Sequence, residues 1–426
     1  MQPNFCFIFP DQHRGDWMPY EDPIFEKLKT EKPPLNMPNV KKLINSGACF
    51  YRCVTPSPLC APARACLASG LRFSDCPVPD NDVDYPTDTE SFYRVLRDSG
   101  YSVGGVGKFD LHKATYFWGF DGWVDGLGKI GFTSAVDSEG KWDAIGAYNM
   151  TPTGPKGPYM KYLRDKGLDG DHISDMGRRR EGGKYYTEPT TLPDSAYGDT
   201  WVGTNGIKML KSFPKDKPWF LQVNFPGPHA PWDVTQSMRK RWENISFPAA
   251  GNGDASKAAD LNRVRQNYAA MLENIDTQTG LLLDEIRRRG DWDNTIIIYS
   301  SDHGEMLGDW GRFGKSCPDR GSINVPLVFA GPGIRENICT GALAEITDLS
   351  ATILDFAGIS NRFHEAYSMK KVLTGEAASY RRTVQSALSN WKAIIGKKYK
   401  IIIQNSEVTE KYNVLEDPLE RENLIR

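Results

Sequence analysis

The sequence of 426 residues has no long hydrophobic run and no excess of charge of one sign. Its longest apolar stretches, at 4–9 and 295–299, have the length of strands, well short of the roughly 20 residues that a membrane helix needs. Lysine and arginine number 52 and aspartate and glutamate 54, a net charge of −2. This balance argues against a nucleic-acid or membrane-surface protein, and leaves room for a local basic pocket.

Cysteine is scarce for a disulfide-stapled protein. The chain has eight cysteines, and they show no CxxC or Cys/His spacing typical of zinc sites. There is also no basic segment followed by an apolar one at the start, so we expect no signal peptide and a cytoplasmic location. Removal of a leader ahead of residue 1 would instead indicate a periplasmic or secreted protein. No internal repeat is present.

What the sequence does contain is a series of short apolar strands that alternate with amphipathic helices. A Thr87-Asp88-Thr89-Glu90 capping box precedes one helix that ends at Gly100, and a longer helix is predicted at about 261–289. The predicted strands lie at 4–9, 101–106, 218–225 and 295–299. This alternation predicts an α/β fold with a large, mostly parallel sheet sandwiched by helices.

Two further regions differ from this pattern. The segment 129–200 is rich in glycine, proline and charge, which predicts an irregular insertion that shapes a substrate pocket. Towards the C-terminus, apolar segments at 393–395 and 399–403 flank Gly396-Lys397-Lys398, a hairpin pattern. We therefore expect a catalytic α/β domain at 1–358 and a small C-terminal α+β lobe with an antiparallel sheet at 359–426.

Polar residues suited to metal or anion chemistry follow each predicted strand. Ligands of open α/β sheets bind at the carboxyl ends of the strands, so these residues are expected to share one crevice. Any single one of them could be an ordinary loop residue; four such placements together favour a site. The residues are Asp11, Gln12, Lys108, His112, His229, Asp302 and His303.

The sharpest local motif is Cys60-Ala61-Pro62-Ala63-Arg64, followed by Gly70. The proline and the glycine predict a helix that begins near Cys60 and ends near Gly70. At a helix N-terminus, Cys60 would lie where the dipole and the free N–H groups favour an anion, and Arg64 could reach the same anion. The alternative is an inert buried thiol, which is common for free cysteines.

With this motif the sequence resembles the type I, formylglycine-dependent sulfatases of the alkaline phosphatase superfamily. Their signature is Cys-x-Pro-x-Arg with a glycine six residues later, and Ala63 stands where serine is usual. The resemblance implies an alkaline phosphatase-like fold over nearly the whole chain. Further matching segments, in the family's order, are Asp11-Gln12, Gly107-Lys108, Pro228-His229-Ala230-Pro231, 301–309, Gly314-Lys315, Val325-Pro326-Leu327 and 412–424.

The resemblance implies that Cys60 is oxidised to formylglycine by a maturation enzyme. One hydroxyl of the hydrated aldehyde would attack sulfur and expel the alcohol, and the second would allow sulfate to leave as the aldehyde re-forms. A divalent metal is implied beside it, with calcium preferred and manganese or magnesium as alternatives. The implied metal ligands are Asp11, Gln12, the modified Cys60, Asp302 and His303.

The same resemblance assigns anion binding and acid catalysis. Lys108, Lys315 and Arg64 match the residues that bind the sulfate group, and His229 is the candidate to protonate the leaving alcohol. His112 is a further catalytic candidate, although it lies four residues after Lys108 where the family has histidine two residues after; it could equally be structural. For a sugar substrate, Trp232 and Trp310 are the aromatic residues best placed to stack.

The expected function is hydrolysis of a sulfate monoester, either a sulfated carbohydrate or oligosaccharide or a small aryl sulfate. A phosphonate monoester or phosphodiester hydrolase is the first alternative, because the Asp-Gln and Asp-His pairs resemble that branch of the superfamily. A catalytically silent homologue that binds a sulfated ligand, with Cys60 left as a thiol, is the second. The intact set of metal ligands and cations argues against the silent homologue.

Overall fold

The main sheet of the protein has eight strands in the order β10-β2-β9-β7-β1-β6-β4-β5. The structure is a computed structural model that describes residues 2–251 and 254–425. Within the described sheet only β9 runs against the other strands, so the predicted, mostly parallel sheet is confirmed. The strands are β1 Asn4–Ile8, β2 Gly47–Phe50, β4 Ser102–Gly107, β5 Ser134–Asp137, β6 Trp219–Asn224, β7 Thr295–Ser300, β9 Leu327–Ala330 and β10 Ile338–Thr340.

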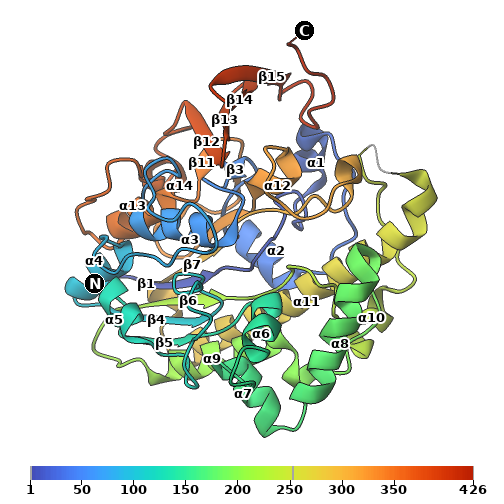
Figure 1. The fold of residues 1–426 in the computed structure, drawn as a ribbon. Helices are drawn as coiled ribbons and strands as arrows, with labels where there is room; N and C mark the ends of the chain where they lie inside the picture. The colour runs from blue at the N-terminus through green and yellow to red at the C-terminus, as the bar shows by residue number, and fades with distance from the viewer. Residues whose placement is uncertain (1, 252–253, 426) are drawn as a thin grey trace.

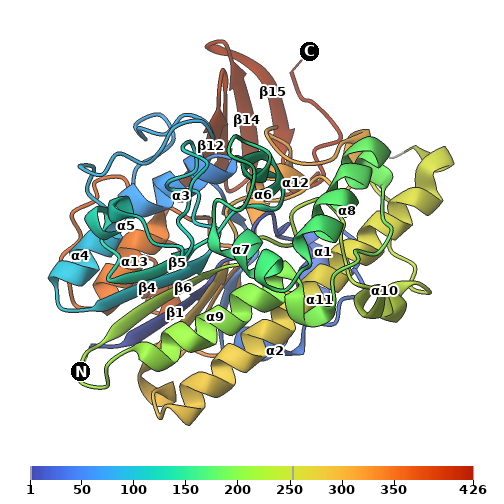
Figure 2. The same cartoon turned by 60° about the horizontal axis from the view of Figure 1, so that its bottom comes forward.

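Helices cover both faces of this sheet (Figures 1 and 2). One face carries α2 Pro38–Asn45, α9 Gly198–Ser212 and α11 Ala258–Arg288, and the other carries α3 Cys60–Ser69, α4 Phe92–Asp98 and α13 Asp348–Phe356. Alternate residues of β1 serve the two faces: Phe5 and Phe7 pack in one core, Cys6 and Ile8 in the other. Burial on both faces explains why this strand reads as one apolar run.

Helix boundaries agree with the sequence except at α4. The long helix α11 matches the predicted helix at 261–289 closely. The capping box predicted at Thr87 is wrong, because α4 begins five residues later and its cap is Ser91, whose Oγ accepts a hydrogen bond from the N–H of Arg94 at 3.1 Å. None of the described helices combines the length and the apolar composition that crossing a membrane requires.

The segment 129–200 is more regular than the sequence indicates. It contributes β5, which pairs in parallel with β4 at the edge of the main sheet. Its helices have a small apolar core of their own, which includes Ile145, Met160 and Leu163. The helices around this core are α6 Lys141–Tyr148, α7 Pro158–Asp165 and α8 Asp169–Gly182, whereas α5 Asp125–Ile130 packs against the main core.

A separate four-stranded antiparallel sheet lies near the C-terminus, at the top of Figures 1 and 2. It contains the predicted hairpin, which is confirmed as β13 and β14. A small three-stranded sheet, β11-β3-β8, has β3 and β11 in contact with β12. The strands of these two small sheets are β3 Cys53–Val54, β8 Asn324–Val325, β11 Ala344–Glu345, β12 Thr383–Leu388, β13 Trp391–Gly396, β14 Tyr399–Gln404 and β15 Glu407–Asn413. The division of the chain at 358 stays a prediction.

The other α-helices connect these layers. They are α1 Asp22–Leu28, α10 Gln236–Trp242, α12 Arg320–Ile323 and α14 Lys370–Leu373.

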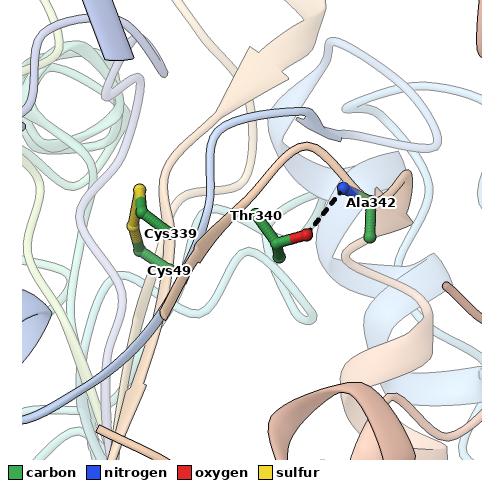
Figure 3. The surroundings of a disulfide bond; sticks show 4 residues. All are labelled: Cys49, Cys339, Thr340 and Ala342. Atoms are coloured by element: carbon green, nitrogen blue, oxygen red, sulfur yellow. Dashed lines mark hydrogen bonds between the residues drawn. A yellow bond between two sulfur atoms is a disulfide. The ribbon is translucent and has the colours of Figure 1, made fainter. Parts of the chain in front are cut away.

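One disulfide joins the last two strands at an edge of the main sheet (Figure 3). Cys49 on β2 faces its register partner Cys339 on β10, 290 residues later in the chain. Beside it, Thr340 Oγ1 accepts a hydrogen bond from the N–H of Ala342 at 3.0 Å and shapes the turn that follows β10. The other six cysteines are free, so a single bridge, and no disulfide scaffold, is present among the described residues.

A buried carboxylate, Glu139, holds the loop between β5 and α6 against the start of α7. It accepts a hydrogen bond from the N–H of Tyr159 at 3.3 Å, and a Cβ at Gly157 would collide with its carboxyl group. Burial raises the pKa of Glu139 to about 7, although backbone donors lower it. Because the folded pKa lies above the unfolded one, the stability that Glu139 contributes is greatest at low pH and falls as pH rises from about 4.5 to about 7.

Glu139→Gln should remove this pH dependence. Relative to the parent protein, the free energy of unfolding of the variant should improve by roughly 2–3 kcal/mol between pH 4.5 and pH 8, since the ionised carboxylate no longer has to be buried. Urea unfolding at a series of pH values measures the difference. Glu181→Gln, at an exposed position on α8, is the control and should give a flat difference. A flat difference for Glu139→Gln as well would contradict the prediction.

Candidate active site

Four adjacent strands of the main sheet deliver the predicted site residues to one edge. The strands lie side by side in the order β7-β1-β6-β4. Asp302 follows β7, Asp11 follows β1, His229 follows β6 and Lys108 follows β4. The structure therefore brings together the groups that the sequence places after separate strands, as expected for the carboxyl edge of a parallel sheet.

Cys60 is the first residue of α3 and lies in the middle of this group. Gly70, at φ 65°, ends the helix in the left-handed region, as the motif predicts. The Cys60 Sγ lies 3.0 Å from Lys315 Nζ and 3.3 Å from His303 Nε2. The side chain is buried, with 2% of the residue exposed, and its contacts are polar.

The surrounding cations set the charge of Cys60. Burial and Asp11 raise the pKa of its thiol, but Lys108, Lys315 and His303 outweigh them and hold the pKa well below its ordinary value. A negatively charged atom is therefore favoured at position 60. The same environment would suit an oxyanion that replaces the sulfur.

Four side chains at this point fit a divalent cation. Ligand atoms of Asp11, Cys60, Asp302 and His303 all lie within 4.8 Å of one another, and all four residues are buried. His303 Nε2 is 3.7 Å from Asp11 Oδ1 and 3.7 Å from Asp302 Oδ2. Carboxylate oxygens with one imidazole are ligands for a divalent ion, and the sulfur marks the place of the oxygen atoms of a formylglycine.

Gln12 connects this cluster to Lys315 and Glu305 through hydrogen bonds. Its Nε2 donates to Glu305, its Oε1 accepts from Lys315 Nζ at 2.9 Å, and its N–H donates to Asp302 Oδ1 at 3.0 Å. Its φ of 69° is unusual for a residue with a side chain, and such backbone is found at functional sites. Its role as a metal ligand stays a prediction.

Arg64 lies behind the carboxylates, which differs from the expected direct contact with substrate. Its Nε donates to Asp302 Oδ2 at 2.9 Å and its Nη2 to Asp11 Oδ2 at 3.3 Å. Its Nη1 donates to the carbonyl of Lys108 and to Asn224 Oδ1. Because these donors are engaged and the residue is 2% exposed, Arg64 is placed to fix the two carboxylates.

Two lysines supply the positive charge of the crevice. Lys108 Nζ donates to Asp11 and lies 3.0 Å from Asp110 Oδ2. Burial alone would lower the pKa of Lys108, but Asp11 and Asp110 raise it well above its ordinary value, so it stays charged. Lys315 Nζ lies between Cys60 and His229, 2.9 Å from His229 Nε2.

The expected catalytic position of His112 is not found. Its Nδ1 is 3.3 Å from Asp84 Oδ2 and its Nε2 is 3.1 Å from Thr115 Oγ1, so the contacts that the structure describes for it lie outside the Cys60 cluster. The polar group beside Lys108 is instead Asp110, which also lies 3.4 Å from Lys113 Nζ. Asp110, with a φ of 52°, turns the chain shortly after Lys108 and so leaves His112 outside the cluster.

Sequence reasoning missed three residues that position the site. Glu305 accepts hydrogen bonds from Gln12 and from the N–H groups of Leu307 and Gly314, and its signal was its place in the matching segment 301–309. The signal for Asp110 was that it stands two residues after Lys108, where the family has histidine. Tyr268, whose hydroxyl donates to the Gln12 carbonyl at 2.7 Å, gave none, because it reads as one more apolar position of α11.

The charges of the site are balanced by direct pairing. Burial would raise the pKa of Asp11, but Lys108, His229, Lys315 and Arg64 hold it well below its ordinary range. Asp11 is thus a carboxylate at neutral pH. A buried site with ionised carboxylates, cations and a nucleophile at a helix N-terminus is suited to hydrolysis of an anionic ester.

Fold and site together define a hydrolase of the alkaline phosphatase superfamily, and comparison with known proteins specifies the family. The model of the family described as "Sulfatase" matches residues 3–359 of this chain. The chain belongs to the sulfatase family, and the resemblance stated from the sequence is confirmed. It is therefore a sulfatase-family enzyme.

Individual relatives are distant and cover the whole chain. An arylsulfatase of Clostridium perfringens is 26% identical over 100% of this chain and 90% of its own length. A protein solved in complex with its substrate D-glucosamine-2-N,6-O-disulfate has a TM-score of 0.74 and 19% identity, covering 100% of this chain and 93% of that one. A phosphonate monoester hydrolase of Agrobacterium radiobacter has a TM-score of 0.75 and 21% identity, covering 99% and 91%. The two structures support the fold.

Replacing Cys60 should separate activity from stability. We expect Cys60→Ala to lower hydrolysis by roughly 10³-fold or more while the free energy of unfolding changes by about 1 kcal/mol or less, because its neighbours are polar groups rather than a packed apolar core. Cys66→Ala, on the same helix but in the hydrophobic core, is the matched control. It should lose about 1–2 kcal/mol of stability and keep its activity.

Ester hydrolysis and urea unfolding measure the two effects. If Cys60→Ala unfolds under conditions where Cys66→Ala does not, then Cys60 is a structural residue.

Proposed function

We propose that this chain hydrolyses a sulfate monoester of an aryl alcohol or a carbohydrate at Cys60. The observation that carries the proposal is the position of the Cys60 Sγ, within one 4.8 Å cluster with Asp11, Asp302 and His303 and 3.0 Å from Lys315 Nζ. A nucleophile, a set of cation ligands and an anion-binding lysine thus share one point. The arylsulfatase relative and the neighbour with a disulfated glucosamine substrate support this substrate class.

The proposed site takes two groups that the polypeptide does not encode directly. Formylglycine formed from Cys60 supplies a hydrated carbonyl as the nucleophile. A divalent ion held by Asp11, Asp302 and His303, with Gln12 as a further oxygen ligand, supplies a Lewis acid. We propose calcium, because three of these residues offer oxygen.

The protein's own residues bind and orient the sulfate group in this proposal. Lys108 and Lys315 attract its non-bridging oxygens, and their charges act strongly because the site is buried. Arg64 keeps Asp11 and Asp302 in place from behind. Gln12 and Glu305 fix Lys315 through the hydrogen bond from Lys315 Nζ to the Gln12 amide oxygen.

His229 is the proposed proton donor to the leaving oxygen. Its Nδ1 is 2.5 Å from the carbonyl of Ala230, which acts as the acceptor and fixes the ring. Nε2 then lies 2.9 Å from Lys315 Nζ, and it carries the transferable proton when the ring is an imidazolium. A fixed ring with one nitrogen towards the reacting group is the arrangement that general acid catalysis needs.

A phosphonate monoester or phosphodiester hydrolase is the second candidate. The observation that favours it is His303, an imidazole rather than an amide among the cation ligands, with Nε2 3.3 Å from the Cys60 Sγ. Against it stands the pair of lysines, Lys108 and Lys315, whose combined charge suits the three non-bridging oxygens of a sulfate monoester.

A paired assay decides between the two candidates. For matched aryl esters, kcat/KM should be higher for the sulfate monoester than for the phosphodiester or phosphonate monoester. The sample must come from a host with the maturation enzyme, and mass spectrometry of the Cys60 peptide gives the converted fraction. A preference for the diester supports the second candidate. Absence of turnover of both by a converted sample would overturn the proposed hydrolysis and leave a ligand-binding protein.

His229→Ala should slow substrates with poor leaving groups most. For an alkyl or sugar sulfate we expect a loss of roughly 10²–10⁴-fold in kcat, because the departing alkoxide needs a proton. For 4-nitrophenyl sulfate, whose leaving group is stable as an anion, the loss should be much smaller. His364→Ala, at an exposed position, is the control. Equal losses on both substrates would contradict the acid role of His229.

A further inference from the structure

A cavity of about 320 Å³ opens beside the loop that carries His229. Ala230 and Pro231, which directly follow His229, form part of its wall, and Trp142, Tyr186 and Trp232 supply aromatic surface. This volume lies at the lower end of the range for small-molecule sites, and an aromatic lining with a few polar groups is typical of them. Trp232 was expected near the substrate from the sequence; Trp310 does not line this cavity.

A second loop ties the same cavity to the cluster at Cys60. Lys184, which lines the cavity, has its Nζ 5.1 Å from the centre of the Phe313 ring. Phe313 lies two residues before Lys315, whose Nζ contacts both Cys60 and His229. The cavity is therefore bordered by the loop that carries His229 and by Lys184, which contacts the loop that carries Lys315.

The charge of the cavity is positive and largely uncompensated. Arg180 on α8 and Lys184 after it are exposed, and neither has a carboxylate within 4.0 Å among the described residues. The Arg180 guanidinium lies 5.6 Å from the centre of the Trp142 ring on α6. Arg179 is different, because it pairs with buried Asp175 at 2.9 Å.

Arg179 instead builds the wall. Its Nη2 donates to the carbonyl of Glu188 at 2.7 Å and its Nη1 to that of Trp232 at 3.4 Å, and the Trp232 Nε1 donates to the Lys184 carbonyl at 2.9 Å. These bonds hold Lys184 and Trp232 at fixed positions. The backbone that carries the Lys184 charge is thus held against the aromatic wall of the cavity.

We propose that this cavity binds the organic half of the substrate and selects a sugar that carries a second anionic group, a sulfate or a carboxylate. The aromatic side chains accept the apolar face of a sugar ring, and Arg180 and Lys184 pair with the second anion. This inference rests on the proposed function, because it takes the cavity as the leaving-group side of the Cys60 site.

Arg180→Gln, Lys184→Gln and the double variant test the selection. The substrates are a monosaccharide disulfate, a sulfated uronic acid and the corresponding monosulfate of the neutral sugar. Each single variant should lower the preference in kcat/KM for the two dianions over the monosulfate by roughly two- to fivefold, and the double variant by about tenfold, mainly through KM. The preference should also shrink at high ionic strength.

Arg178→Gln is the matched control, two residues from Arg180 on the same helix but outside the cavity lining. It should keep the parent's preference. An unchanged preference in the double variant, or an equal fall with Arg178→Gln, overturns the inference. A fall for the disulfate alone, or for the uronic acid alone, assigns the second anion as sulfate or carboxylate respectively.

Calorimetry on the Cys60→Ala protein separates this inference from the proposed function. Tighter binding of the monosaccharide disulfate than of the monosulfate, lost in the Arg180→Gln/Lys184→Gln background, supports the cavity even if the parent protein hydrolyses no sulfate ester. Equal binding of the two sugars overturns the cavity assignment even if sulfate monoesters are hydrolysed.

Discussion

The site depends on the pairing of two fully buried carboxylates with buried cations. Asp11 and Asp302 have no exposed surface, and an ionised group in such a place is costly unless charges of opposite sign contact it. Arg64 binds both, and Lys108 binds Asp11, while His303 Nε2 lies 3.7 Å from an oxygen of each carboxylate. Ligand atoms of both acids lie within 4.8 Å of those of Cys60 and His303, so the paired carboxylates form part of the candidate cation site. Removing Arg64 would take the guanidinium away from both buried carboxylates.

The fold makes this pairing possible because β1, β6, β4 and β7 are neighbours, although their sequences are far apart. Each strand is largely apolar, and the residues that follow it, such as Asp11, Lys108 and Asp302, are polar but still buried. The segment 129–200 then adds α6 and α8 beside His229. The strands therefore fix the charged groups of the site, and in the proposed function this helical layer contacts the rest of the substrate.

Much of this arrangement could be predicted from the sequence, and the reasons for the exceptions are physical. Apolar strands, the helix start at Cys60 and the shared crevice follow from local patterns that tertiary contacts reinforce. The direction of Arg64 could not be predicted, because a flexible side chain near a helix start can turn to an anion in solvent or to carboxylates beneath it. Nor could the position of His112 outside the Cys60 cluster, which depends on the backbone turn at Asp110. β5 is only four residues long, too short to give a period.

The near-complete burial of Cys60 limits the time at which this residue can be modified. Its thiol lies at the first residue of α3, in contact with Lys315 and His303, and an exposure of 2% is too small for a second macromolecule to reach it in the folded chain. The proposed conversion of this residue must then occur while the polypeptide is still being made or transported, ahead of compaction. A chain that folds first keeps the thiol of Cys60, and it would have to unfold before this residue could be converted. The burial of this one side chain therefore requires that maturation comes after synthesis and before folding.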